Sequence, residues 1–437
     1  MNYSVHQLIN RGKPEGIEME RTKSYCISKH VVKSAFDRVK ANKGSSGVDQ
    51  QSIEQFERDL KKNIYKIWNR MSSGSYFPPA VKEVSIPKRN GGKRTLGIPT
   101  VGDRVAQMTA KIYLEPELEK YFHRDSYGYR PGKSALDALA KARERCWMHD
   151  WVIDVDIKGF FDNINHELML KALDRHCKEK WVRLYVERWL KADVNRGKGL
   201  PEAKTKGTPQ GGVISPLLAN LFLHYTLDKW MDMNCPANPF ERYADDIIIH
   251  CRTEEESKRV MKAIILRLKD CGLDLNQEKT KIVYCKDDKR KGKYPVQHFD
   301  FLGYRFRPRS SRTRKGQYFT NFSPAISPSS KKKISEEMKR WRIHAISNCN
   351  LKEIADHINP KIRGWINYYG RFYKSELYRL LARLDYRIIR WCMTKYKIKR
   401  KKRAVELYKS IKAKEQALFA HWNFFSYYYN DRIIKAV

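Results

Sequence analysis

Acidic residues are scarce in this sequence. Its 437 residues include 88 lysines and arginines but only 49 aspartates and glutamates, which leaves a formal net charge of +39 at pH 7. A charge of this size repels itself unless a polyanion neutralises it. The excess predicts a nucleic acid as partner, with an anionic membrane surface as the second possibility.

Long apolar runs and paired cysteines are missing too. No apolar stretch approaches the roughly 18–20 residues of a membrane helix, and residues 1–23 mix glutamates with basic side chains where a secretion signal would be apolar. The nine cysteines stand singly, with no C-x-x-C pair, which argues against disulfides and structural zinc. We therefore expect reduced thiols, no membrane partner and a cytoplasmic location.

The chain is too apolar for a disordered basic tail, because 41% of its residues are hydrophobic and 12% aromatic. Hydrophobic spacing predicts an α+β order, with strands and helices mixed before about residue 310 and helices alone after about 330. Helices are expected over 29–70, 103–122 and 253–271, hairpins over 81–99 and 242–250, and strands at 151–157, 281–285 and 299–307. The predicted division is a helical extension (1–75), a mixed region (76–310), a Ser-, Pro- and Arg-rich linker (311–330) and a helical region (331–437).

Basic residues are concentrated near the C-terminus. From Pro324 to Val437 the sequence has 27 basic and 9 acidic residues, a net charge of +18, and seven of the nine residues from Lys395 to Arg403 are basic. A single run of this kind can be a solvated helix face. Within a chain of +39, it favours a surface that binds phosphates.

Two adjacent aspartates, Asp245 and Asp246, stand in the turn of the 242–250 hairpin. Like charges this close resist ionising unless a cation relieves them, and hard carboxylate oxygens suit Mg²⁺. Asp156, at the end of an apolar strand, can join them if that strand lies beside the hairpin, and two metals held there would support an in-line phosphoryl displacement. Alternation places Asp154 on the same face as Asp156. The spacing does not choose between Asp154 and Asp156 as the third carboxylate. A solvated turn that binds no metal is a further alternative.

Longer segments surround these carboxylates in a fixed order. Asp-Ile-Lys-Gly-Phe-Phe-Asp-Asn-Ile begins at Asp156, Gly-Thr-Pro-Gln-Gly-Gly-Val-Ile-Ser-Pro-Leu-Leu-Ala-Asn at Gly207, and Arg-Tyr-Ala-Asp-Asp at Arg242. The other segments are the basic hairpin 86–99, Tyr-Gly-Tyr-Arg-Pro-Gly-Lys-Ser at 127–134, Phe-Leu-Gly-Tyr at 301–304 and Lys-Ile-Arg-Gly-Trp-Ile-Asn-Tyr-Tyr at 361–369. In this order they resemble the motifs of group II intron reverse transcriptases, from about residue 30 to the C-terminus.

The resemblance implies the fold of a right-hand polymerase. Residues 76–310 would be fingers and palm, 331–437 an α-helical thumb or maturase domain, and 1–75 an extension that contacts RNA. It implies that Asp156, Asp245 and Asp246 are the catalytic residues, and it favours Asp156 over Asp154 because Asp156 directly precedes Ile-Lys-Gly-Phe-Phe. These aspartates, assisted by a backbone carbonyl near Ile157, would hold two Mg²⁺ ions.

The same resemblance implies nucleotide-binding roles. Lys88 and Arg94 would contact the triphosphate, Phe161 would close on the sugar, and Gln210 and Gly211 would line the incoming nucleotide. A solvated hairpin tip is the alternative for the first pair, and core packing is the alternative for Phe161. The implied primer grip is Phe301, Leu302, Gly303 and Tyr304, and the implied RNA-binding residues are Lys361, Arg363, Tyr368, Lys399, Arg400, Lys401, Lys402 and Arg403.

The implied function is RNA-directed DNA synthesis that copies intron RNA into DNA during retrohoming, together with intron-RNA binding that assists splicing. The partners would be group II intron RNA, an RNA template, a DNA primer, deoxynucleoside triphosphates and target DNA. Two alternatives stay open: a host-domesticated enzyme in DNA repair or phage defence, and a splicing factor with little polymerase activity. The sequence has no histidine and paired-cysteine cluster of the kind found in the family's C-terminal nuclease, so we expect no DNA cleavage by this chain.

Overall fold

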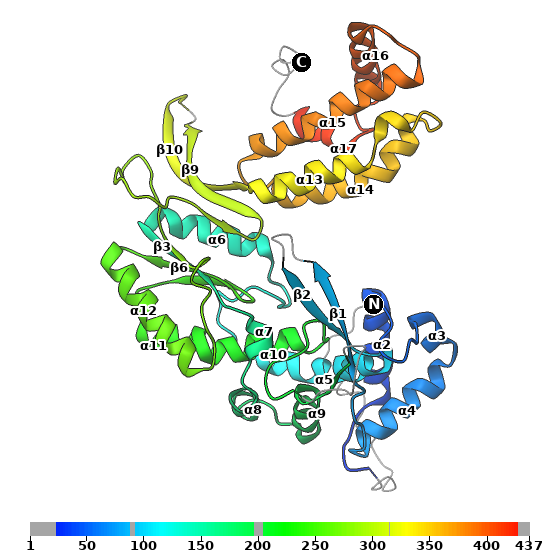
Figure 1. Ribbon diagram of the computed structural model, residues 1–437, viewed down its shortest axis with the longest axis vertical. Coiled ribbons are helices and arrows are strands. Elements are labelled where there is room, and N and C mark those ends of the chain that lie inside the picture. Colours follow the sequence, from blue (N-terminus) through cyan, green and yellow to red (C-terminus); the bar gives the residue numbers. More distant parts are fainter. Residues whose placement is uncertain (1–22, 88–91, 196–203, 314, 427–437) are drawn as a thin grey trace. The chain divides into compact units, whose positions relative to one another are not determined.

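The chain divides into two units in the computed structural model, which describes residues 23–87, 92–195, 204–313 and 315–426 (Figure 1). The first unit combines the described residues up to Ser134 with Ile153–Lys281. The second combines Ala135–Val152 with the described residues from Ile282 onward. The division therefore differs from the boundaries expected at residues 75, 310 and 330, because the segment 135–152 packs with elements that follow it by more than a hundred residues.

Helix α5 (Val101–Glu119) forms the centre of the first unit. The Thr100 side chain caps it by accepting a hydrogen bond from the Asp103 amide at 3.1 Å. Residues around most of the α5 circumference are buried, as expected of a helix that packs on several sides. The other helices in the described part of this unit are α2 (Lys29–Asn42), α3 (Ile53–Arg58), α4 (Leu60–Ser72), α7 (Phe160–Asn163), α8 (His166–Asp174), α9 (Lys180–Leu190), α10 (Ser215–Leu223), the π-helical turn η1 (His224–Asp228), α11 (Lys229–Asn234) and α12 (Glu254–Asp270).

Two sheets carry the motif residues that precede Ile282. The first has the strand order β2 (Lys93–Ile98), β1 (Val81–Pro87) and β4 (Val194–Asn195), and the second has the order β5 (Phe240–Tyr243), β6 (Asp246–Cys251), β3 (Trp151–Asp156) and β7 (Lys281–Tyr284). In the second sheet Ile247, Ile248 and Ile249 of β6 are all buried, so both faces of this strand are covered. The two hairpins expected from the sequence, β1–β2 and β5–β6, are both present.

The described part of the second unit is mainly helical. Helix α6 (Ala135–Met148) lies against a three-stranded sheet of order β10 (Tyr318–Ile326), β9 (Tyr304–Arg312) and β8 (Phe299–Phe301), and the Trp147 ring N–H donates to the Phe322 carbonyl at 2.9 Å. An apolar core that includes Ile358, Ile362, Leu381 and Ile388 joins the helices that follow. These helices are α13 (Pro328–Arg340), the 3-10 turn η2 (Ile343–Ala345), α14 (Leu351–Tyr369), α15 (Lys374–Lys395), α16 (Lys401–Lys414) and α17 (Ala420–Ser426).

Residues 311–330 contain a strand and the start of a helix where a linker was expected. Strands β9 and β10 form an antiparallel hairpin of nine residues each, and α13 begins at Pro328. Phe306 and Phe322 are buried against Phe299, with ring centroids 4.6 and 6.1 Å from it. Composition suggested a linker because the segment is rich in Ser, Pro and Arg, yet polar side chains of the hairpin such as Arg309 and Ser323 are buried.

The expected α+β class with a helical C-terminal region is confirmed. Among the described residues, no helix combines the length and the apolar character that crossing a bilayer requires. Of the predicted segments, residues 1–22 of the N-terminal extension and residues 88–91 of the basic hairpin lie outside the described residues.

Candidate active site

A tight turn presents Asp245 and Asp246. Strands β5 and β6 pair antiparallel with Tyr243 opposite Asp246, so only Ala244 and Asp245 form the connection. Ala244 has a φ of +57°, in the left-handed region that a side chain rarely adopts without support from its surroundings. The turn places Asp245 in the connection itself and makes Asp246 the first residue of β6.

Asp156 ends β3, which is the neighbour of β6 in the sheet. Its carbonyl accepts a hydrogen bond from the Asn276 amide at 2.8 Å, and its amide donates to Thr280 Oγ1 at 3.3 Å. Its carboxylate lies 3.3 Å from Lys279 Nζ. The Asp154 carboxylate is engaged elsewhere, 3.8 Å from Lys281 Nζ.

The three aspartates interact electrostatically. Desolvation by the surrounding protein raises the pKa of Asp246 to about 6, with repulsion from Asp245 and Asp156 adding to the shift and Lys279 opposing it. The Asp246 side chain is nevertheless accessible to solvent, so protein atoms crowd the carboxylate while one side stays open. A carboxylate in this position favours a bound cation, because a divalent ion offsets the repulsion between the neighbouring carboxylates that otherwise keeps one of them protonated.

Carboxylate oxygens suit Mg²⁺, which does not require a complete shell of protein ligands. Among the described residues, no group of three or more His, Cys, Asp or Glu side chains lies close enough together to hold a metal ion. Mg²⁺ is commonly held by one or two carboxylates and completes its shell with waters and substrate phosphates. Two of the aspartates Asp156, Asp245 and Asp246 would meet that requirement, and the carbonyl of Ile157, the next residue after β3, would supplement them.

A buried ion pair supports the turn that carries Asp245 and Asp246, here called the aspartate turn. The Arg242 guanidinium is fully buried and donates to both carboxylate oxygens of Asp228 at 2.7 and 2.6 Å. It also donates to Asn220 Oδ1 at 2.9 Å and to the Ala244 carbonyl at 3.2 Å. The last bond holds the carbonyl of the left-handed residue in the turn, so the position of Asp245 depends on this network.

The segment around Gly128 supports the turn from the strand edge. The Tyr127 amide donates to the Arg242 carbonyl at 2.8 Å, and Asn220 Nδ2 donates to the Gly128 carbonyl at 2.7 Å. A Cβ at Gly128 would lie 2.4 Å from the Ala244 nitrogen. Only glycine therefore allows this segment to approach the turn so closely.

Sequence reasoning missed these supporting roles of Arg242, Asp228, Asn220 and Gly128. One signal was available: Glu241 and Arg242 are adjacent charged residues in a short strand, and burial of either requires a partner of opposite charge. The sequence alone did not identify Asp228 as that partner, because it lies on a different element, η1.

Hydrogen bonds join the glycine-rich loop 207–212 to β2 of the first sheet and to α7. The Thr208 amide donates to the Phe161 carbonyl at 2.8 Å, and the Gly97 amide of β2 donates to the Gln210 carbonyl at 2.9 Å. Gly211 has a φ of +126°, and a Cβ there would meet the Gly97 carbonyl oxygen at 2.6 Å. The predicted nucleotide residues Phe161, Gln210 and Gly211 are therefore brought together with β2.

A cavity of about 450 Å³ opens beside this loop. Gln210, Asp162, Thr95, Lys204 and Lys206 are among the residues that line it. Its size is in the range of small-molecule sites. The Phe161 side chain is 8% exposed and packs beside Phe160 with ring centroids 5.3 Å apart, so core packing accounts for this side chain in the structure.

Of the two predicted triphosphate contacts, only Arg94 is among the described residues. Arg94 belongs to β2 and is paired with Ile86 of β1. Lys88 lies outside the described residues. The strands of the hairpin pair from Lys82–Ile98 to Pro87–Lys93.

The predicted primer grip is a tight hairpin in the second unit. Phe301 ends β8, Tyr304 begins β9, and Leu302 and Gly303 between them have φ values of +49° and +80°. The Tyr368 hydroxyl donates to the Leu302 carbonyl at 2.8 Å, and Tyr304 donates to the Tyr368 carbonyl. Tyr368, predicted to bind RNA, is thus half-buried against this turn.

The remaining predicted RNA-binding residues are dispersed over the helices of the second unit. Lys361 of α14 forms an ion pair with Glu337 of α13, whereas Arg363 of α14 is exposed. The residues from Lys399 to Arg403 are exposed and surround the start of α16. The structure therefore does not gather all eight residues into one patch.

Comparisons with known proteins agree with these motifs. The family model for reverse transcriptase (RNA-dependent DNA polymerase) matches residues 86–306, and the model for the group II intron maturase-specific domain matches residues 331–409. Among solved structures, telomerase from Candida albicans, in a complex with a TWJ fragment of telomeric RNA, aligns with a TM-score of 0.44 and 15% identity over 86% of this chain and 68% of that chain.

Two curated relatives give the extent of the similarity. Group II intron-encoded protein LtrA of Lactococcus lactis subsp. cremoris is 32% identical over 233 residues, which are 52% of this chain and 38% of LtrA. Protein YkfC of Escherichia coli K12 is 30% identical over 312 residues, which are 61% of this chain and 77% of YkfC. The chain thus spans well under half of LtrA and most of YkfC. On these matches, the chain belongs to the reverse transcriptase family and carries a group II intron maturase-specific domain.

Proposed function

We propose that this protein is an RNA-directed DNA polymerase of the group II intron type. The observation that carries the proposal is the approach of Asp156, Asp245 and Asp246 at the ends of the adjacent central strands β3 and β6, where desolvation and like charge raise the pKa of Asp246 to about 6. A site that accumulates carboxylates in this way binds divalent cations, and a two-metal site accelerates phosphoryl transfer. The family supports the choice of reaction.

In this proposal each group of residues has one task. Asp156 and Asp245 would be the main ligands of Mg²⁺, and Asp246 would support them. The bound ion would supply charge stabilisation to the primer 3′-hydroxyl and to the leaving pyrophosphate. Lys88 and Arg94 bind the triphosphate as cations, which neutralises charge that develops during transfer. Gln210 and Gly211 line the nucleotide beside the 450 Å³ cavity.

The second proposed activity is binding of intron RNA that assists splicing. The region from Pro324 to Val437 carries 27 basic and 9 acidic residues, and the maturase-specific model matches most of its length. Phosphate contacts dominate the affinity of such surfaces. Template RNA, DNA primer and target DNA are further proposed partners, and retrohoming is the proposed context.

Primer extension tests the polymerase proposal. The full chain, an RNA template, a DNA primer, deoxynucleotides and Mg²⁺ should give extended product, and Asp245→Asn should reduce the rate by at least a hundredfold. Asp154→Asn is the matched control, because Asp154 lies two residues before Asp156 on the same strand and pairs with Lys281. Synthesis by Asp245→Asn at the wild-type rate would refute the site, and loss in both variants would refute the choice of Asp156 over Asp154.

A further inference from the structure

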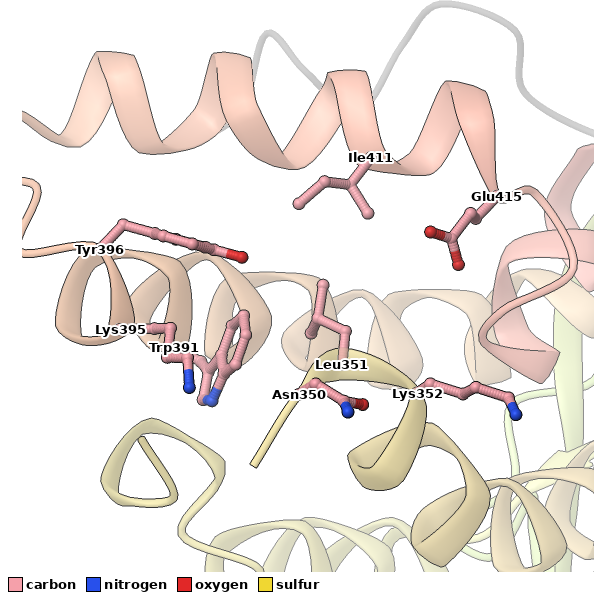
Figure 2. A pocket seen from close by; sticks show the side chains of 8 residues that line it. All are labelled: Asn350, Leu351, Lys352, Trp391, Lys395, Tyr396, Ile411 and Glu415. Carbon is pink, nitrogen blue, oxygen red and sulfur yellow. The ribbon is translucent and has the colours of Figure 1, made fainter. Parts of the chain in front are cut away.

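A groove in the second unit has the chemistry of a nucleobase site. It lies between α16, the end of α15 and the start of α14, and has a volume of about 310 Å³ (Figure 2). Figure 2 shows Ile411 and Leu351 approaching it from opposite sides, with Tyr396 toward one end and Glu415 toward the other. A flat apolar ligand with a polar edge matches this arrangement.

The aromatic end of the groove is preformed. Trp391 is buried and its ring N–H donates to the Ile346 carbonyl at 2.8 Å, which holds the indole in place. Tyr396 packs against it edge-on, with ring centroids 5.9 Å apart and an interplanar angle of 88°. Because Tyr396 is still 52% exposed, much of its ring is available to a ligand. Proteins that recognise single-stranded RNA stack unpaired bases on side chains of this kind.

The charges around the groove select for a nucleotide. Seven of the nine residues from Lys395 to Arg403 are basic, and Lys395 at the groove donates to the Ser347 carbonyl at 2.7 Å. Glu415 is the exception, an exposed carboxylate that pairs with no side chain among the described residues. A ligand that suits both features carries phosphates outside the groove and N–H donors on the part that enters it.

We propose that this groove binds one unstacked guanine of single-stranded RNA. The base lies between Leu351 and Ile411 and contacts the Tyr396 ring, and its adjacent N1–H and N2–H donors bond the two oxygens of Glu415. The basic run 395–403 holds the flanking phosphates. Guanine is favoured because it alone presents two neighbouring donors on its pairing edge, and a carboxylate accepts such a pair in bidentate form. The inference deepens the proposed RNA binding and rests on it.

Fluorescence anisotropy of the full chain tests the proposal. The probes are fluorescein-labelled decauridine RNA and the same decamer with one central guanosine, in about 0.3 M KCl to suppress non-specific phosphate binding. We expect about tenfold tighter binding of the guanosine decamer, in the range of one bidentate base contact. Glu415→Gln should abolish this preference and leave decauridine binding unchanged.

Tyr396→Ala should weaken binding of the guanosine decamer about tenfold, as loss of one stacking contact does, and Tyr396→Phe should restore it. Tyr318→Ala is the matched control, because Tyr318 is 75% exposed on β10 and lies outside the groove. A decamer with 4-thiouridine beside the guanosine should cross-link to the peptide that contains Tyr396.

Two results would overturn the proposal: equal affinity for both decamers, or wild-type binding by Tyr396→Ala. Primer extension separates this inference from the proposed polymerase activity. Tyr396→Ala should extend a preannealed primer at the wild-type rate. If the protein prefers guanosine but does not extend primers, the guanine site in the groove would stand and the proposed polymerase activity would be refuted.

Discussion

Replacement of Gly128 by alanine tests whether the aspartate turn must be held in place. A Cβ at this position would lie 2.4 Å from the Ala244 nitrogen and 2.9 Å from the Tyr243 carbonyl carbon, where 3.4 Å is an ordinary contact. The turn must therefore move by about 1 Å, because both opposing atoms are backbone. Gly128 does not have a positive φ, so alanine is compatible with its own backbone conformation.

A displacement of about 1 Å in a reacting group costs roughly a hundredfold in rate. We therefore expect Gly128→Ala to reduce single-turnover primer extension about a hundredfold, with much less effect on primer–template affinity. Gly364→Ala is the control, because no atom lies within 4 Å of a Cβ at that position on α14. Primer extension by Gly128→Ala within a factor of three of wild type would show that the turn tolerates the displacement, and the positioning argument would be wrong.

Three further predictions concern charge. Asp228→Asn leaves the buried Arg242 guanidinium uncompensated and should lower the free energy of unfolding by about 3–5 kcal/mol in guanidinium chloride denaturation. The control Asp174→Asn removes an exposed pair with Arg183 and should lower it by less than about 1 kcal/mol. Equal losses would contradict a stabilising role of the buried Arg242–Asp228 pair. The pKa of Asp246 is raised to about 6 from an ordinary value of 3.8, so the folded protein binds the proton more tightly than the unfolded chain and loses stability as the pH rises from about 4 to 6. With a chelator present, Asp246→Asn should melt at a higher temperature than wild type at pH 8, and the difference should vanish near pH 4. Addition of Mg²⁺ should raise the melting temperature of wild type more than that of the variant. Identical melting curves at pH 8 would refute this prediction. The logarithm of the RNA affinity should fall linearly with the logarithm of the salt concentration, and replacing both Lys399 and Lys402 by alanine should reduce the slope by about 1.4 for single-stranded RNA; an unchanged slope would place the contacts elsewhere.

Local patterns in the sequence determined the composition of the site and the class of the fold. The period-two and helical spacings predicted the β1–β2 and β5–β6 hairpins and the helices that follow residue 330, because each pattern is set by neighbours within a few residues. Ordered motifs identified Asp156, Asp245 and Asp246, and the charge of +39 indicated a polyanionic partner. The same local reasoning failed at 311–330, where a composition rich in Ser, Pro and Arg concealed a hairpin strand.

Only the tertiary structure decided which side chains act on one another. Strand alternation could not separate Asp154 from Asp156, whereas the fold pairs Asp154 with Lys281 and brings Asp156 close enough to Asp246 to shift its pKa. The Arg242–Asp228 pair and the approach of Gly128 to Ala244 join positions that are 14 and 116 residues apart in the chain. Such contacts depend on how strands and helices pack, and no periodicity within one element encodes them. The sequence thus named the candidate groups, and packing decided which of them interact.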